Sequence, residues 1–183
     1  MSDWPSFPLL EALPTVHVGS LESVGPDLAG TTIQIATIVS GAWPGASRAQ
    51  FAPFYNFGRR PIVVQRLWWL NGTPLSGNVD MGIYDATFRR LVSTGSVLQA
   101  GVSVIQGVAV SLALPPGGPY YFALACDNVT AQFARFAALA TDLTLMGCAT
   151  ATPAFPLPPV ATLGPWVANS YLPYMGLSQR GFP

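Results

Sequence analysis

The stretch Val104–Leu114, which reads VIQGVAVSLAL, alternates between bulky and small residues. Bulky residues dominate the even positions and small residues the odd ones, with Gln106 and Ile105 as exceptions. A period of two is typical of a β-strand with one buried face. The turn sequence PPGGP follows at 115–119, and Tyr120–Cys126 (YYFALAC) then alternates again. We therefore predict an antiparallel hairpin over residues 104–126.

Further strands are predicted on the N-terminal side of this hairpin. Residues 79–84 and 89–96 alternate around the turn at 85–88, and earlier strands are expected at 33–39, 51–57 and 62–70. Residues 131–146 fit either a short helix or, over 130–136, a strand, and both interpretations stay open. Short strands separated by turns every 8–12 residues predict an all-β fold, an antiparallel β-sandwich of jelly-roll type, over residues 31–150.

The two ends of the chain have a different character. Residues 1–30 and 151–183 are interrupted by prolines, which neither a helix nor a central strand tolerates. Both ends carry large apolar side chains, so we interpret them as extended arms that dock on another surface. The expected interface residues are Trp4, Phe7, Leu9, Leu10, Phe155, Leu157, Trp166, Tyr171 and Tyr174. The alternative is that both arms fold back over their own sandwich and close its edge strands.

Composition restricts the partners. Among 183 residues, eight Arg balance eight Asp and Glu, and only 9% of residues are charged. Zero net charge argues against nucleic-acid binding, which needs clustered cations. No apolar run reaches the length of a membrane-spanning helix, and the N-terminus does not resemble a signal peptide. A surface with so little charge favours burial against other subunits.

Residue types that support catalysis are scarce. The single histidine, His17, lies in the N-terminal arm, and with two distant cysteines it does not supply a metal site. Asp80 is expected on the non-core face of its strand, whereas Asp85 is expected to cap backbone amides in a turn. Cys126 and Cys148 are expected to be buried free thiols. We therefore predict no catalytic residues, no cofactor and no metal.

Two aromatic pairs suggest a binding surface. Neighbouring strand residues point to opposite faces, so one member of Trp68-Trp69 and one of Tyr120-Tyr121 should face outward. An outward Trp69 or Tyr121 would stack on a sugar or anchor a protein interface.

Several phrases of the sequence resemble small β-rich structural proteins of tailed bacteriophages. They are IVVQRLWWLNG at 62–72, SGNVDMGIYD at 76–85, RLVSTGS at 90–96 and YYFALA at 120–125. Later pieces at 155–158 and 171–174 extend the resemblance over residues 40–177. It implies a virion component without catalytic residues, made in the host cytoplasm.

The expected function is therefore a non-enzymatic structural subunit of a phage virion: a capsid decoration, tail or fibre-associated protein. Its expected partners are itself, as a homo-oligomer with a trimer as the first guess, and other virion proteins, with no nucleic acid and no membrane. The alternative is a carbohydrate-binding module used for host or surface adhesion.

Overall fold

The computed structural model describes residues 15–17, 39–136, 140–166 and 171–178. Over these residues the protein is all-β and its strand pairs are antiparallel, consistent with a β-sandwich. The one α-helix in these ranges is short, α2 (Ala140–Leu145). The predicted strand at 33–39 lies outside the described residues except for Val39.

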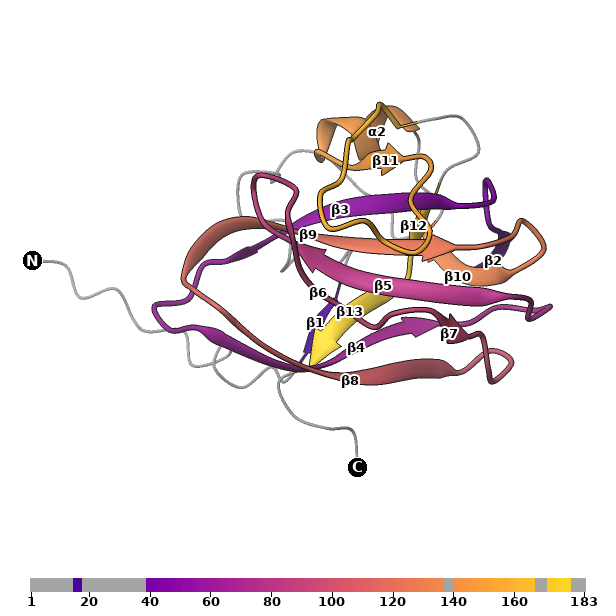
Figure 1. Ribbon diagram of the computed structural model, residues 1–183, viewed down its shortest axis with the longest axis horizontal. Helices are drawn as coiled ribbons and strands as arrows, with labels where there is room; N and C mark the ends of the chain where they lie inside the picture. The colour runs from indigo at the N-terminus through magenta and orange to yellow at the C-terminus, as the bar shows by residue number, and fades with distance from the viewer. Residues whose placement is uncertain (1–14, 18–38, 137–139, 167–170, 179–183) are drawn as a thin grey trace, which may run out of the picture.

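Three sheets build the fold (Figure 1). The six-stranded sheet has the order β11 (Ala149–Ala151), β3 (Arg48–Asn56), β9 (Gly117–Cys126), β5 (Asn78–Tyr84), β6 (Arg90–Ser93), and β7 (Val97–Leu98) also pairs with β5. The four-stranded sheet has the order β1 (Thr15–His17), β13 (Met175–Ser178), β4 (Ile62–Leu70), β8 (Ile105–Leu114). The third has the order β12 (Leu172–Pro173), β10 (Gln132–Phe136), β2 (Val39–Ala42).

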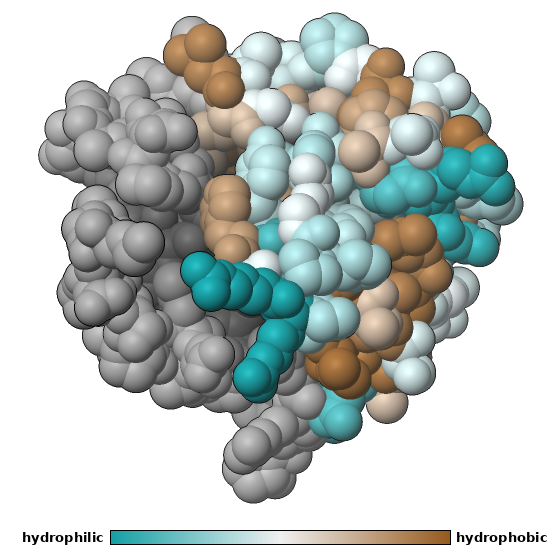
Figure 2. Space-filling view, turned by 90° about the vertical axis from the view of Figure 1, so that its left-hand side faces the viewer, coloured by the Kyte–Doolittle hydropathy of each residue, from teal (hydrophilic) through white to brown (hydrophobic). Residues whose placement is uncertain are grey.

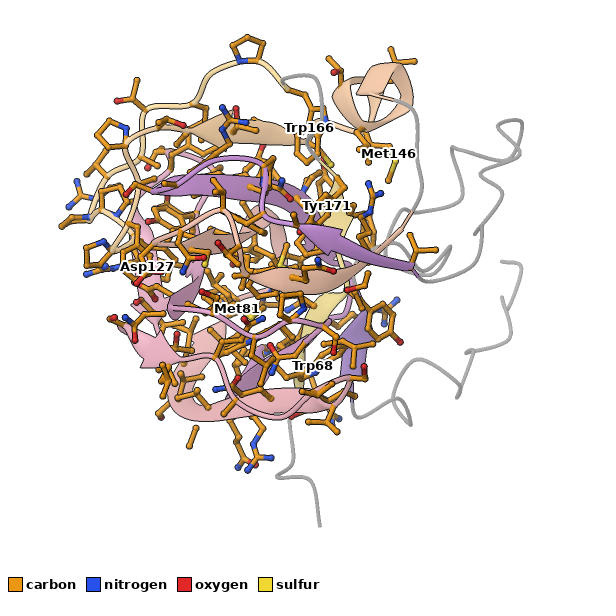
Figure 3. The ribbon with its side chains drawn as sticks, turned by 90° about the vertical axis from the view of Figure 1, so that its right-hand side faces the viewer. Trp68, Met81, Asp127, Met146, Trp166 and Tyr171 are labelled. Atoms are coloured by element: carbon orange, nitrogen blue, oxygen red, sulfur yellow. The ribbon has the colours of Figure 1, made fainter. Side chains whose placement is uncertain are left out.

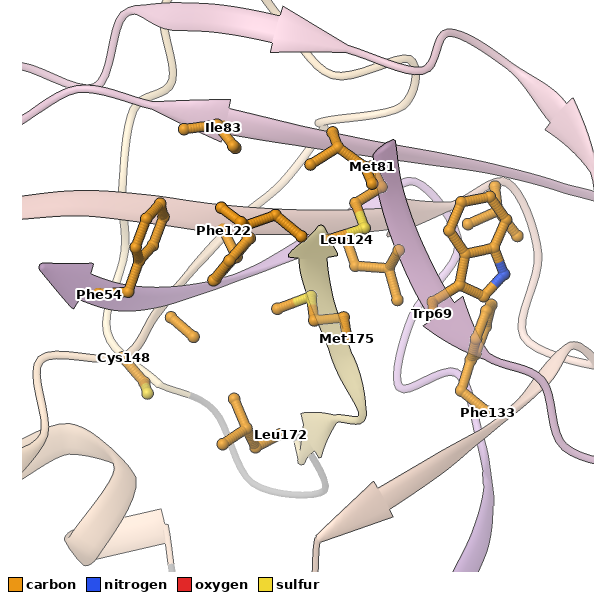
Figure 4. Packing of buried hydrophobic residues seen from close by; sticks show 14 of the residues in the cluster. Phe54, Trp69, Met81, Ile83, Phe122, Leu124, Phe133, Cys148, Leu172 and Met175 are labelled. Carbon is orange, nitrogen blue, oxygen red and sulfur yellow. The ribbon is translucent and has the colours of Figure 1, made fainter. Parts of the chain in front are cut away.

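The main hydrophobic core lies between the six-stranded sheet and the other two. Phe54 and Phe122 stack at 4.1 Å between ring centroids, and Met175 and Trp69 belong to the same core (Figure 4). All four side chains are fully buried. Removing large apolar side chains from water is the main favourable term in folding, so the shared burial of side chains from facing sheets holds the layers together.

A second, smaller core covers the opposite face of the six-stranded sheet. Phe51 and Tyr84 meet edge to face at 5.1 Å, and Ala154, Leu157 and Ala161 pack over that face. The hydroxyl of Tyr84 donates a hydrogen bond of 2.6 Å to the carbonyl of Pro158. The Pro-rich segment after β11, residues 152–166, therefore covers the sheet of its own chain.

Residues 105–114 form a strand, β8, as predicted, but the strand that pairs with β8 differs from the prediction. The half-buried Val108, Val110 and Leu112 of β8 pack against the main core, and the odd positions Ala109 and Ser111 are exposed. The predicted 104–126 hairpin is wrong, because β8 pairs with β4 whereas β9 pairs with β3 and β5.

Two successive prolines explain that difference. Pro115 and Pro116 lack the N–H groups that would close a hairpin, and the chain crosses here between sheets. Strands on facing sheets point their bulky residues at the same core, so alternation alone does not distinguish the two arrangements. The predicted hairpin around 85–88 is confirmed by the pairing of β5 with β6, and 131–146 contains both a strand (β10) and a short helix (α2).

Candidate functional site: an exposed aromatic row

Four aromatic side chains gather at one end of the outer face of the six-stranded sheet, two from its strands and two from the adjoining connections. We call Tyr55, Phe57, Phe88 and Tyr121 the aromatic row. Tyr121 of β9 is in register with Pro53 of β3, so Tyr55, two residues further on, is its diagonal neighbour on the same face. Burial raises the pKa of Tyr121, and the nearby Tyr55 raises it further.

The rings of the row pack in two pairs. Tyr55 and Phe57 stack with centroids 5.1 Å apart and planes at 14°, and Phe88 lies 4.8 Å from Tyr121 at 52°. Tyr55 is 43% exposed and Phe57 is 66% exposed. Large aromatic side chains held together yet facing water are characteristic of recognition surfaces.

A buried asparagine holds the loop that carries Phe57. The Nδ2 of Asn56 donates to the carbonyls of Arg60 and Leu114, each at 3.0 Å, and its Oδ1 accepts the N–H of Gly58 at 3.1 Å. These bonds satisfy the amide and join the loop after β3 to the end of β8. Phe57 is thus presented by a hydrogen-bonded loop rather than by a free one.

An aspartate holds the turn that carries Phe88. One carboxylate oxygen of Asp85 accepts the backbone N–H groups of Thr87, at 2.8 Å, and Arg89, at 3.0 Å. This is the capping role predicted for Asp85. Slight burial raises the pKa of this carboxyl, but the hydrogen bonds from Arg89 and Thr87 outweigh burial and lower it. Phe88 itself has a positive φ of 58°, a conformation that costs energy in a bulky residue.

Arginines flank the row at both ends. Arg59 and Arg60 follow Phe57 on its loop, Arg89 follows Phe88, and all three are exposed. Asp85 is the one acidic residue in the connections β3–β4 and β5–β6, which carry these three arginines, so the surface has a net positive charge. Figure 2 views the molecule from the end where the β3–β4 connection lies, and teal hydrophilic side chains stand there beside brown hydrophobic ones.

Trp69 does not contribute to this surface. Trp68 and Trp69 are both fully buried, and the indole N–H of Trp69 donates to Asn71 Oδ1 at 2.9 Å. The prediction that one indole of the pair faces outward, available to a sugar, is therefore wrong. Trp68 lies between two glycines in register, Gly107 and Gly176, on the other face of β4. When both faces of a strand are covered, two successive residues such as Trp68 and Trp69 are both buried, and the alternation of the sequence does not reveal this.

The predicted contact residues of the C-terminal segment lie within the fold of their own chain. Leu157, Trp166 and Tyr171 are buried, whereas Phe155 and Tyr174 are half-buried. The Tyr171 hydroxyl donates to the carbonyl of Gly41 at 2.8 Å, and Figure 3 shows Trp166 and Tyr171 packed beside the sheets. This placement matches the alternative in which the segment folds back.

The N-terminal contact residues Trp4, Phe7, Leu9 and Leu10 lie outside the described residues.

Two further carboxylates have hydrogen-bonded, structural positions. Asp80 lies on the face opposite the main core, as predicted, and the segment after β11 buries it fully there. It accepts Ser93 Oγ at 2.6 Å. Asp127 accepts the backbone N–H and the Nδ2 of Asn78, at 3.0 Å and 2.9 Å. Among the residues that the structure describes, no three His, Cys, Asp or Glu side chains gather as metal ligands would.

Both cysteines are buried and free, as predicted. Burial raises the pKa of Cys126 to about 11 and that of Cys148 to about 12. At neutral pH both are therefore protonated thiols without the nucleophilic character of a catalytic cysteine.

Sequence reasoning identified Tyr121 but missed Tyr55, Phe57 and Phe88. The signal for the first two was present, because Phe51, Pro53, Tyr55 and Phe57 share one phase of a predicted strand. Phe88 gave none, because a turn residue has no periodicity. Which aromatic residues stay exposed depends on where the segment after β11 ends its cover, and the sequence does not show this.

The comparisons with known proteins add no relative. No family model, no curated protein and no solved structure matches this chain. Within the described ranges, no helix has the length and hydropathy needed to cross a membrane.

Proposed function

We propose that this protein is a non-enzymatic structural component of a bacteriophage virion, made in the host cytoplasm, that acts through protein–protein contacts. The observation that carries the proposal is the exposure of grouped apolar side chains on a fold whose core is already closed. At one end Tyr55 and Phe57 are 43% and 66% exposed. A monomer gains nothing from such exposure, whereas an assembly buries it.

A second exposed group supports the same proposal. Leu98, Val102, Val104 and Ile105 are between 45% and 65% exposed around the connection from β7 to β8. No charged residue occurs between Arg90 and Asp127 in the sequence, so this group has no charged neighbours within its own segment. A neutral apolar edge is suited to contact with another protein subunit.

Three carboxylates also support this proposal. Asp80, Asp85 and Asp127 each accept hydrogen bonds from backbone or side-chain donors within the fold, so their oxygens stabilise its structure.

The jelly-roll topology is likewise a proposal, supported by the repeated crossing of the chain between sheets from β3 to β4, β4 to β5 and β8 to β9.

Mass spectrometry of purified particles tests the proposal. We expect the chain at a fixed copy number relative to the major capsid protein across independent preparations. A host protein of similar abundance in the lysate serves as the contamination control. Absence from washed particles, or a copy number that falls with each wash as the control does, would overturn the proposal.

The second candidate is a carbohydrate-binding module, and the half-exposed Tyr121 beside Tyr55 favours it. Aromatic faces stack on the apolar faces of sugars. Glycan-array binding that is lost in Tyr121→Ala and kept in Tyr120→Phe, a change on the buried face, would favour this candidate over the structural one.

A further inference from the structure

We propose that the aromatic row with its flanking arginines is the docking surface for residues 1–14 of a second copy of this chain. This inference rests on the proposed function, because it names how one subunit holds the next. The observations that carry it are the exposed rings, the charges around them and the end of the molecule at which β1 begins.

The charges of the two surfaces are complementary. Residues 1–30 contain four acids, Asp3, Glu11, Glu22 and Asp27, and no arginine, so all eight arginines lie at or after position 48. The docking surface carries Arg59, Arg60 and Arg89 against the single acid Asp85. Residues 1–14, with Asp3 and Glu11, therefore offer negative charge where the surface offers positive charge.

The apolar content is matched as well. Residues 1–14 hold Trp4, Phe7, Leu9 and Leu10 between prolines, too few to form a core alone. The aromatic row offers partly exposed rings of the kind that bury such anchors, at about 1.5–3 kcal/mol for each large side chain. Proline restricts the unbound segment, so less conformational entropy is lost on docking.

Strand register places the start of β1 at this end of the molecule. Thr15 is in register with Ser178, and Ser178 with Arg66, so β1 runs in the same direction as β4 and its first residue faces the end of β4 that begins at Ile62. Ile62 begins β4 directly after the loop that carries Phe57, Arg59 and Arg60. Residues 1–14 are thus joined to the fold at the end of β1 that faces the docking surface's end of the molecule.

The length of the segment allows it to reach a second copy. Fourteen extended residues span about 46–50 Å. That length exceeds the four-residue distance from the level of Arg66 to Ile62 several times over, so the segment is long enough to reach the docking surface of a neighbouring copy.

A charge exchange in the full-length protein tests the inference. Arg59→Glu with Arg60→Glu reverses the docking surface, and Asp3→Arg with Glu11→Arg reverses the segment. We expect wild-type protein to self-associate in sedimentation velocity, and each reversed variant to associate at least about tenfold more weakly. A 1:1 mixture of the two variants should restore association, because each then offers the other a matching charge.

The control is Val129→Glu with Thr130→Glu, which adds negative charge at exposed positions beyond the far end of β9 and should associate as wild type does. Far-UV circular dichroism checks that each variant is folded, and Arg59→Ser with Arg60→Ser replaces the reversed pair if it is not.

A monomeric wild type, unchanged association of the variants, or a mixture that restores nothing would overturn the inference. So would glycan binding that depends on Tyr55 in a protein of unchanged mass. None of these results alters the copy number in particles, so the test is separate from that of the proposed function.

Discussion

The carboxylate of Asp80 accepts the backbone N–H of Leu157 at 2.9 Å, across 77 positions of the sequence. Both residues are buried, and the other carboxylate oxygen accepts the hydroxyls of Ser93 and Thr94. A side-chain nitrogen of Arg90 donates in turn to the carbonyl of Leu157. One aspartate on β5 thereby fastens the Pro-rich cover to the six-stranded sheet.

Removing this carboxylate should destabilise the fold. We expect Asp80→Ala to lower the free energy of unfolding by about 1–3 kcal/mol, because the buried donors of Ser93 and Leu157 lose their acceptor. Urea denaturation followed by tryptophan fluorescence measures it. Ser111→Ala, at an exposed position of β8, is the control and should stay within about 0.5 kcal/mol of wild type. Equal stability of the two variants would contradict this role of Asp80.

Acid should weaken the junction between β9 and β5. Partial burial raises the pKa of Asp127, but hydrogen bonds from Asn78 and Asn128 outweigh burial and hold it below the ordinary value of 3.8. The carboxylate therefore contributes stability above pH 3.8, and this contribution is lost as pH falls through the lower, folded-state pKa.

Asp127→Asn should therefore flatten the pH dependence of the free energy of unfolding below pH 4 and have a smaller fall in stability on acidification than wild type. Denaturation curves between pH 2.5 and 6 give the comparison. A variant that follows the wild-type slope would show that the depressed pKa of Asp127 has no part in acid sensitivity.

Two glycines with the same backbone conformation allow the cost of backbone strain to be measured separately from the cost of a steric clash. Gly77 and Gly95 have φ of +68° and +70°. A Cβ on Gly77 would lie 1.8 Å from Asn128 Nδ2, whereas a Cβ on Gly95 would meet nothing within 4 Å. We expect Gly95→Ala to cost about 1 kcal/mol from backbone strain alone, and Gly77→Ala to cost clearly more. Thermal unfolding of both variants measures the difference, and equal costs would contradict the packing around Asn128.

The thiols should be inert in the folded protein. With pKa values raised to about 11 and 12 by burial, Cys126 and Cys148 expose little thiolate at pH 8. We expect Ellman's reagent to react with neither within minutes under native conditions and with both at once in 6 M guanidinium chloride. Rapid reaction of one thiol in the native protein would mean that the structure around it opens locally.

Much of the fold could be predicted from strand periodicity. The predicted strand at 62–70 coincides with β4, and the prediction at 51–57 falls largely within β3. Alternation reports which residues share a face, and it did so correctly for Val108, Val110 and Leu112. It does not report which strand lies beside which. The sequence therefore predicts that β8 pairs with β9, whereas in the structure β8 pairs with β4.

The candidate site was harder to predict because exposure depends on long-range cover. Tyr84 and Tyr121 are in register on the same outer face, yet the segment after β11 buries Tyr84 and leaves Tyr121 half-exposed. The sequence of either strand contains nothing that decides between them. What decides is the point at which the segment after β11 stops covering the sheet.

The position of β13 has a consequence for how the protein is made. This strand lies between β1 and β4, and of all the strands described it is the last to leave the ribosome. During synthesis the edge of β4 therefore stays unpaired, with Trp69 and Leu67 lacking the strand that covers them. Non-local pairing of this kind slows folding. The four-stranded sheet is completed only after β13 emerges, so an edge of β4 that can pair with other chains stays exposed on the nascent chain through most of translation.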